Sequence, residues 1–176
     1  MANGRTVAIM QPYFFPYIGY WQLLYISDTF VIYDDVNFIK KGWINRNRVL
    51  NKTLNLPEWL TLELIKASQN KLINQIEIGS NKQKLLNKIT TNYGRAPYYK
   101  EIFPFIEKII MYNEPNLSLF LENAIISIAQ LLGIETKKIL RSSLIEKNTS
   151  LKGEEKVLDI CTKLGGNVYV NSIGGQ

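Results

Sequence analysis

The amino-acid sequence predicts an α/β fold, a three-layer Rossmann-like arrangement around a mostly parallel sheet, with a β-ribbon and a helical insertion. The main reason is that strand–helix–strand patterns occur near both ends of the chain, at residues 7–10, 18–26 and 29–33 and again at 136–141, 150–164 and 167–171. Their spacing is that of βαβ units, which pair strands in parallel through right-handed crossovers. The carboxyl ends of these strands then share one edge, and open α/β sheets bind their ligands at that edge.

Between the two units, residues 36–80 predict a basic ribbon and loop insertion. The runs at 45–49 and 54–64 would pair as an antiparallel ribbon whose turn lies near Asn51-Lys52. Polar residues over 65–79 predict a loop.

A helical segment at 81–132 follows the ribbon. Apolar residues at helical spacing predict three helices, at 81–93, 98–111 and 116–132, and the Tyr98-Tyr99 pair is expected in the helical core. Asn116 is a candidate N-cap, and Gly133 is a candidate C-terminal stop. We expect residues 1–176 to form a single domain, because this length is sufficient for one core and too short to argue for two.

The cysteine and histidine content excludes several kinds of site. One cysteine and no histidine rule out a disulfide framework, a Cys/His zinc site and a Ser-His-Asp triad. Cys161 lies in an apolar helical pattern and is expected in the core. Because no apolar run approaches the ~20 residues of a membrane span and no signal-peptide pattern opens the sequence, we expect a cytoplasmic protein.

Positive charge is concentrated in the middle of the chain. The formal net charge is +6, and residues 36–100 hold twelve Lys and Arg against three Glu, whereas the segments on either side are slightly acidic. This surplus fits either a solvated basic face or a surface that binds the phosphates of a nucleotide or an RNA backbone.

A crowded turn after the first strand is the first candidate for ligand binding. Prolines and a glycine shape its backbone, tyrosines supply stacking faces and hydroxyl groups, and a glutamine ends the buried strand. The candidate ligand-binding residues are Gln11, Pro12, Tyr13, Tyr17, Gly19 and Tyr20. The alternative is an aromatic-rich corner of the core. Residues 17–20 also resemble in shape the His-Ile-Gly-His signature of class I aminoacyl-tRNA synthetases and nucleotidylyltransferases, with tyrosine in place of both histidines.

Two carboxylates follow the second strand. Asp34 and Asp35 stand where carboxylates can hold a metal, orient an amine or act as a general base. Because neighbouring residues on a strand point to opposite faces, we expect at most one of them to enter the site. The alternative is that they cap a turn.

The ribbon supplies basic, aromatic and amide side chains that can pair with phosphate or stack on a base or sugar, namely Lys40, Lys41, Trp43, Asn45, Arg46, Asn47 and Arg48. Strand alternation would place Asn45 and Asn47 on one side and Arg46 and Arg48 on the other. An ordinary exposed hairpin remains the alternative. At the last strand end, Ser172 and Gly174 lie in a turn that offers backbone N–H groups.

Taken together, these segments resemble the WbqC-like protein family. The likeness rests on residues 8–20, 29–35, 41–48, 59–62 and 171–175. Members that resemble this sequence are typically encoded with bacterial genes for O-antigen, part of lipopolysaccharide, and other surface polysaccharides, which implies a role in making or decorating a sugar precursor. Family members usually continue past the final Ser-Gly-rich turn, whereas this sequence stops at Gln176.

The residues and the resemblance together lead us to expect a transferase that acylates or aminoacylates an amino sugar. The sugar would be nucleotide-linked or lipid-linked, and an aminoacyl-tRNA is a candidate donor. Asp34 or Asp35 would accept a proton from the attacking amine, with Lys41 beside them in the catalytic set. Phosphate would be held by Lys41, Arg46 and Arg48, and the pocket shaped by Tyr13, Tyr17 and Trp43.

Two other functions remain open. One is a nucleotidylyltransferase-like, ATP-binding or nucleotide-binding enzyme, and the other is a non-catalytic RNA-binding or glycan-binding protein. The sequence identifies no cofactor, no set of metal ligands and no oligomeric state.

Overall fold

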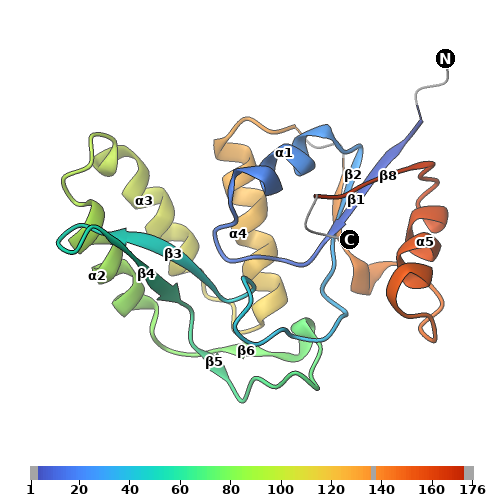
Figure 1. Cartoon of the computed structure of the whole chain (residues 1–176), viewed down its shortest axis with the longest axis horizontal. Coiled ribbons are helices and arrows are strands. Elements are labelled where there is room, and N and C mark those ends of the chain that lie inside the picture. Colours follow the sequence, from blue (N-terminus) through green and yellow to red (C-terminus); the bar gives the residue numbers. More distant parts are fainter. Residues whose placement is uncertain (1–3, 136–137, 173–176) are drawn as a thin grey trace.

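A four-stranded parallel sheet is the centre of the fold, as the sequence predicts (Figure 1). The computed structural model describes residues 4–135 and 138–172. The sheet order is β7-β2-β1-β8, and all three neighbouring pairs are parallel. The strands are β1 (Thr6–Met10), β2 (Thr29–Ile32), β7 (Ile139–Arg141) and β8 (Val168–Val170). This order reverses between β1 and β8, which is the point where Rossmann-like sheets open a crevice for ligands.

Helices cover both faces of the sheet and complete the three layers. Tyr20 and Leu24 of α1 (Ile18–Ile26) and Ile125 of α4 (Leu117–Leu131) pack on Ala8 and Phe30. On the other face, α5 (Gly153–Lys163) packs on β1 and β2 through a cluster of Val7, Ile9, Val31, Ile160 and Cys161. Cys161 is therefore a core residue, as expected, and burial raises the pKa of its thiol.

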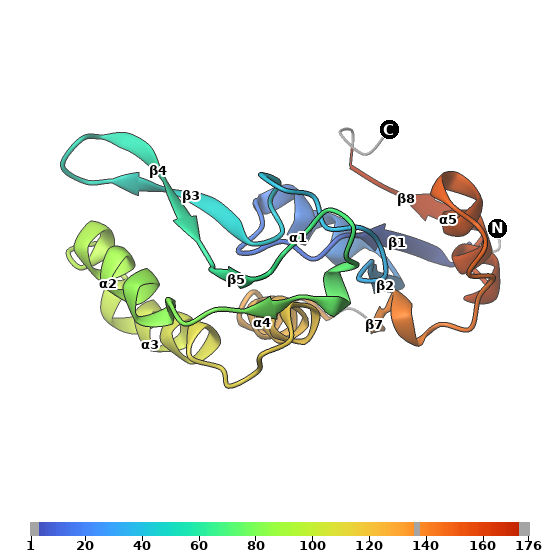
Figure 2. The same ribbon diagram turned by 90° about the horizontal axis from the view of Figure 1, so that it is seen from below.

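The insertion forms a second group of elements beside the sheet (Figure 2). The antiparallel ribbon consists of β3 (Arg46–Asn51) and β4 (Leu56–Thr61), and Asn51 Oδ1 accepts hydrogen bonds from the backbone N–H groups of Thr53 and Leu54 in the turn. Two helices follow, α2 (Lys82–Tyr93) and α3 (Tyr99–Ile110). The ribbon and helices thus follow the predicted order.

Two expectations for local structure need correction. The predicted loop at 65–79 contains a short antiparallel pair, β5 (Leu64–Ile65) with β6 (Glu77–Ile78), because the intervening apolar residues Ile73 and Ile76 are buried. A 3-10 turn, η1, spans Ile73–Gln75. Helix α5 begins at Gly153 rather than at Ser150, because Ser150 bonds to the Asn148 side chain instead.

Helix α4 joins the sheet to the insertion. Its N-terminal half contributes Leu117 and Phe120 to the core under the ribbon, and its C-terminal half contributes Ile125 and Ala129 to the core against the sheet. Asn116 caps the helix as predicted, accepting hydrogen bonds from the N–H groups of Ser118 and Leu119. The helix ends just before Gly133, whose φ of +66° suits a glycine.

No helix in the described ranges 4–135 and 138–172 has the length and apolar character needed to cross a bilayer.

Candidate functional site

The turn after β1 separates into core residues and surface residues. Pro12 and Tyr20 are buried, and the Tyr20 hydroxyl donates to the Gln11 carbonyl at 3.3 Å. Tyr13 is half-buried and packs its ring against Tyr20. As the fourth residue of the Tyr-Ile-Gly-Tyr tetrad, Tyr20 is therefore a core side chain, and the tetrad gives no support to triphosphate binding.

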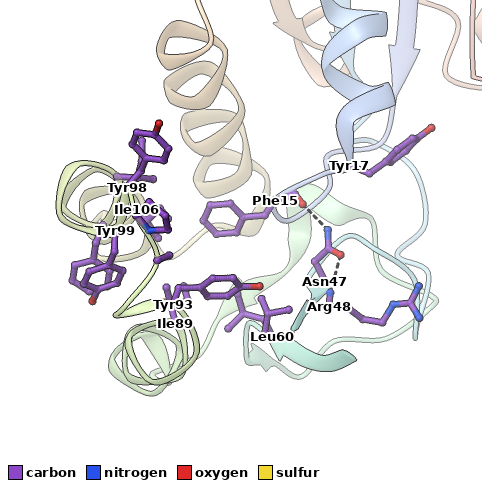
Figure 3. Close-up of a pocket in the computed structure, with 15 residues that line it drawn as sticks. Phe15, Tyr17, Asn47, Arg48, Leu60, Ile89, Tyr93, Tyr98, Tyr99 and Ile106 are labelled. Atoms are coloured by element: carbon purple, nitrogen blue, oxygen red, sulfur yellow. Dashed lines mark hydrogen bonds between the residues drawn. The ribbon is translucent and has the colours of Figure 1, made fainter. Parts of the chain in front are cut away.

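The Tyr17 ring packs directly against Gly19 at the start of α1. A Cβ atom on Gly19 would lie 2.4 Å from the Tyr17 ring, so the glycine is what lets that ring lie against the backbone. The Tyr17 side chain is 58% exposed and lines a pocket under the ribbon (Figure 3). The alternative of an aromatic core corner thus describes Tyr20, whereas Tyr17 lies at the surface.

The ribbon arginines face one side and the asparagines face the other. Arg46 lies 3.9 Å above the Trp59 ring, and Arg48 lies 5.6 Å from the Trp43 ring. Arg46 also donates to the carbonyls of Lys41 and Gly42, so much of its hydrogen-bonding capacity serves the ribbon itself.

The asparagines tie the ribbon to neighbouring segments. Asn45 Nδ2 donates to the Leu62 carbonyl at 2.8 Å. Asn47 Nδ2 donates to the carbonyls of Phe14 and Phe15, and so holds Phe15 in its left-handed conformation, with φ of 49°. Lys40 and Lys41 are exposed, and within the described part of the chain their side chains have no ion-pair or hydrogen-bond partner.

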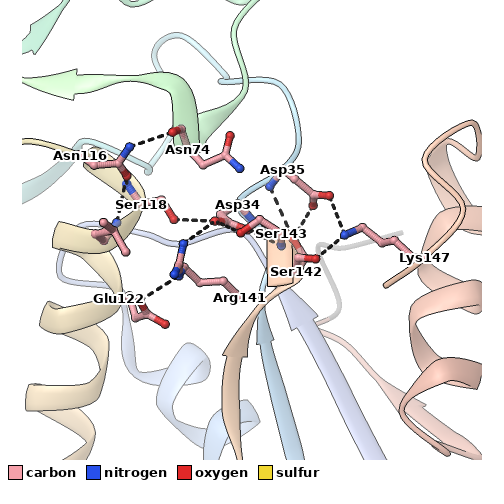
Figure 4. A network of polar contacts seen from close by, with 11 residues as sticks. Asp34, Asp35, Asn74, Asn116, Ser118, Glu122, Arg141, Ser142, Ser143 and Lys147 are labelled. Atoms are coloured by element: carbon pink, nitrogen blue, oxygen red, sulfur yellow. Dashed lines mark hydrogen bonds and ion pairs between the residues drawn. The ribbon is translucent and has the colours of Figure 1, made fainter. Parts of the chain in front are cut away.

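Asp34 is the centre of a polar network at the carboxyl edge of the sheet (Figure 4). Its side chain is fully buried, and its oxygens accept hydrogen bonds from Ser118 Oγ at 2.8 Å, Ser143 Oγ at 2.8 Å, Ser143 N at 2.9 Å and Ser142 Oγ at 3.1 Å. Ser118 lies in the first turn of α4, where the helix dipole favours a negative charge. Asp34 therefore connects the ends of β2 and β7 with the start of α4.

Arg141 completes this part of the network. Its guanidinium lies 3.8 Å from Asp34 Oδ2 and 3.0 Å from Glu122 Oε2 on α4. Burial and the negative charge of Asp34 raise the pKa of the Glu122 carboxyl, even though Arg141 acts in the opposite direction.

Asp35 has a different environment, because it bridges two lysines. Lys147 Nζ lies 2.9 Å and Lys156 Nζ lies 3.1 Å from Asp35 Oδ2. Burial by itself would raise the pKa of the Asp35 carboxyl, but hydrogen bonds from Ser142, Lys147 and Lys156 outweigh it and lower the pKa below its usual value. The two carboxylates thus separate into one fully buried group and one partly exposed group, although both lie against the Ser142 hydroxyl. Whether either of them enters a ligand site stays a prediction.

The two lysines differ in how much of their hydrogen-bonding capacity is used. Lys147, with a side chain only 4% exposed, donates to Asp35 and to the carbonyls of Ser142 and Ile145, which uses all three of its N–H groups. Lys156 donates to the Asp35 side chain and to the Asp35 carbonyl at 2.9 Å. Among the described residues no acceptor takes its third N–H, so this cation has capacity left for a ligand.

Three further predicted residues follow β1 or β8 in the sequence, the two strands between which the strand order reverses. Gln11 follows β1 directly, and in the part of the chain that the structure describes its side-chain amide has no hydrogen-bond partner. The backbone N–H of Ser172, after β8, bonds to the Asn171 side chain at 2.8 Å. Gly174 lies outside the described residues.

Sequence reasoning missed the side chains that contact the two aspartates, which are Ser118, Arg141, Ser142, Ser143, Lys147 and Lys156. It also missed Glu122, which pairs with Arg141. A signal for Ser142 and Ser143 was available, because they follow the predicted strand 136–141 in the same way that Asp34 and Asp35 follow the strand before them, and Arg141 is the last residue of that strand. The lysines lie in a loop and on α5, where only the folded chain brings them to Asp35. No cluster of three or more Cys, Asp or Glu side chains that could hold a metal ion occurs in the described ranges.

The comparisons with known proteins place the chain in a family. A sequence model of the WbqC-like protein family matches residues 11–176. Over 171 residues the chain is 30% identical to Rv1507c of Mycobacterium tuberculosis, described as an uncharacterized protein, and the match covers 95% of this chain and 72% of that protein. No solved structure matches the chain. The family match covers nearly the whole sequence, including both aspartates and the ribbon, and the chain therefore belongs to the WbqC-like protein family.

Proposed function

We propose that this protein is a transferase of surface-polysaccharide biosynthesis that acylates or aminoacylates the amine of a nucleotide-linked or lipid-linked amino sugar. The observation that carries the proposal is the pairing of Asp35 with Lys156 at the carboxyl edge of a parallel sheet. One group is an ionised, partly exposed carboxylate and the other is a cation with an unused N–H. Such a pair can orient an amine and stabilise a developing oxyanion.

Each group has a defined task in the proposed reaction. The substrate amine attacks the carbonyl carbon of an acyl donor, a C–N bond forms, and the bond from that carbon to the leaving sulfur or oxygen breaks. Asp35 orients the amine and accepts its proton, and the leaving group takes up a proton as it departs. Lys156 donates to the oxyanion of the tetrahedral intermediate or to a phosphate. Asp34 serves this arrangement by fixing the strand ends, because its oxygens are already engaged by protein donors.

Direct assay tests the proposal. The protein is incubated with UDP-linked and dTDP-linked amino sugars, together with either acyl-CoA or charged tRNA, and the sugar is analysed by mass spectrometry. The expected product is a sugar whose mass has increased by one acyl or aminoacyl group. If no donor and acceptor combination gives a product, the transferase assignment is wrong.

A matched pair of variants on α5 assigns the role of Lys156. Lys156→Met removes the cation beside Asp35, whereas Lys163→Met removes an exposed lysine from the same helix. With the active donor, we expect Lys156→Met to lower kcat/KM at least about tenfold, which corresponds to losing one charge-assisted hydrogen bond, and Lys163→Met to leave it unchanged. Equal kinetics of the two variants would exclude Lys156 from the reaction.

A non-catalytic RNA-binding or glycan-binding role is favoured by one separate observation. Trp43 and Trp59 are 40% and 42% exposed, with ring centroids 5.7 Å apart, and Arg46 and Arg48 lie against them. Exposed tryptophans beside arginines can stack bases or sugars. This role predicts binding without turnover, steep weakening of RNA binding with salt, and no effect of Lys156→Met on binding.

A further inference from the structure

The turn of the β3–β4 ribbon is an exposed apolar tip, and in both views it lies at the opposite end of the molecule from α5 (Figure 1 and Figure 2). Leu54 in the turn is 67% exposed, and Leu50 and Leu56 in the flanking strands are at least half-exposed. Covering such side chains is favourable in proportion to the apolar area removed from water. A projecting tip with three exposed leucines is therefore suited to an apolar partner.

The tip belongs to a stretch in which all charged side chains are positive. Residues 36–57 contain five Lys and Arg and no Asp or Glu. Glu58, the first carboxylate after them, is already paired with Lys88 at 3.2 Å. Among the described residues, no carboxylate lies within ion-pair distance of the five cations, which are Lys40, Lys41, Arg46, Arg48 and Lys52. The stretch is therefore complementary to a surface of negative charge.

One face of the ribbon connects these cations with the apolar tip. Arg48 pairs with Trp59 across the two strands, and Leu50, two residues later, pairs with Pro57 and so lies on the same face. Trp43 lies beside Trp59, with ring centroids 5.7 Å apart, and both tryptophans are partly exposed. Tryptophan is enriched where a membrane meets water, because its ring is apolar and its N–H is polar. Leucines, tryptophans and cations on one surface are the combination found in segments that lie in a membrane interface.

We propose that the ribbon docks the protein on a bilayer surface rich in anionic phospholipids, with the leucines of the tip in the hydrocarbon boundary and the cations against the lipid phosphates. Charge complementarity identifies this partner, because each Lys or Arg near an anionic bilayer strengthens binding. The leucines favour a membrane over RNA, since an RNA backbone would pair with the same cations and leave the leucines in water. The docking does not depend on the transferase assignment, because it follows from the ribbon surface alone.

Co-sedimentation of the full chain with vesicles tests the docking. One set of vesicles contains equal parts of phosphatidylglycerol and phosphatidylcholine, and the other contains phosphatidylcholine alone. We expect binding to the mixed vesicles to be at least about tenfold tighter, and to weaken as salt is added. Because Trp21 is buried in the core, a blue shift of the tryptophan emission on binding would report Trp43 and Trp59.

Two double variants with matched exposure test the leucines. Leu54→Gln with Leu56→Gln removes the apolar tip without adding charge, and should weaken binding to the mixed vesicles at least about tenfold. The control is Leu144→Gln with Leu158→Gln, because these leucines are as exposed as the first pair but lie in the 3-10 turn η2 (Ser142–Leu144) and on α5. We expect the control to bind as the wild type does.

A second pair of variants tests the cations. Lys52→Gln removes the cation of the turn and should weaken binding to the mixed vesicles about fivefold, with little effect on the weak binding to phosphatidylcholine. Lys163→Gln, an exposed position on α5, is the control and should change neither. Circular dichroism verifies that each variant is folded.

Several results would overturn the proposal. They are absence of vesicle binding, equal binding to the two kinds of vesicle, binding without a shift of the tryptophan emission, and binding that the variant with both tip leucines replaced retains. Binding of a single-stranded RNA oligonucleotide, retained in that variant and without vesicle binding, would assign the ribbon face to RNA instead. Self-association that the variant loses, again without vesicle binding, would assign the tip to a contact between two copies.

Discussion

The carboxyl edge of the parallel sheet is lined by polar side chains, whereas the pocket under the ribbon is lined mainly by apolar ones. At the edge, Asp34 is completely buried and four protein donors approach its oxygens. Under the ribbon, apolar and aromatic side chains line a pocket and remain partly at the surface, with Tyr98 69% exposed. The edge satisfies its polar groups internally, whereas the pocket leaves apolar surface available.

This contrast teaches that proximity to the ligand edge of a sheet does not by itself make a residue a ligand contact. Asp34 lies at the edge of the sheet where a catalytic carboxylate would be expected. Its oxygens, however, are occupied by hydrogen bonds from the protein, as in a carboxylate with a structural role. Asp35, one residue later, is partly exposed, and its partner Lys156 has an N–H group that no described acceptor takes. Function at the edge is therefore expected from Asp35 and Lys156, with Asp34 holding them in place.

Asp34→Ala should have the largest effect on stability. The substitution leaves the Ser118 and Ser143 hydroxyls without their acceptor and removes one of the two carboxylates beside Arg141. Breaking such a network costs about 3–5 kcal/mol of unfolding free energy. Urea unfolding followed by circular dichroism measures it, with the exposed Glu155→Gln on α5 as control. A loss below about 1 kcal/mol would show that the network does not stabilise the strand ends.

Most of the fold could be predicted because its signals are local. Apolar runs and turn residues predicted the four parallel strands and their helices, and Asn116 was recognisable as an N-cap from its position alone. The short β5–β6 pair could not be predicted, because its two-residue strands are defined by burial of Ile73 and Ile76 in a core that forms only on folding.

The candidate site was predictable only in part. Asp34 and Asp35 stood out by following a strand, but Lys147 and Lys156 lie more than 100 residues away and reach Asp35 through tertiary packing. The pocket was missed for a related reason. Tyr98 and Tyr99 were expected in the helical core, but they lie where α2 passes into α3, at the rim of a cavity.

After Asp34, we expect Asp35 to make the second largest contribution to the unfolding free energy, and the pH dependence of that free energy should reveal it. Its pKa is lower in the folded chain than the ordinary 3.8, so its ionised form stabilises the fold above that value, and this contribution is lost as the pH falls through the folded pKa. In Asp35→Asn, unfolding free energy at pH 7 should fall by about 2 kcal/mol. The difference from wild type should shrink below pH 4.

Unfolding curves of both proteins from pH 7 to pH 2.5 measure this difference. Taking the difference matters, because Glu122, whose pKa is raised, contributes with the opposite sign: its stabilisation is present at low pH and is lost as the pH rises. A pH-independent difference between wild type and Asp35→Asn would contradict the lowered pKa of Asp35.

Asn47→Ala tests the link between the two regions with a smaller expected effect. The amide joins β3 to the turn that leaves the sheet edge, and its loss should cost about 1.5 kcal/mol of unfolding free energy. Because Asn47 also holds Phe15 in a left-handed conformation, its loss should loosen the turn. Urea unfolding followed by circular dichroism measures the change, and a loss below about 0.5 kcal/mol would show that the turn keeps its shape without the amide.

The smallest expected difference in unfolding free energy is between variants of the two ribbon arginines, Arg46 and Arg48, which lie two residues apart on the same face. Arg46→Gln removes stacking on Trp59 and the hydrogen bonds to the 41–42 carbonyls, and should cost about 1 kcal/mol of unfolding free energy. Arg48→Gln should change stability by less than about 0.5 kcal/mol, because the guanidinium is exposed and has no described hydrogen-bond acceptor. Urea unfolding of the two variants side by side measures this contrast. If Arg48→Gln destabilised the fold as much as Arg46→Gln, the contacts of the Arg48 guanidinium with Trp43 and Trp59 would stabilise the ribbon as much as those of Arg46 do.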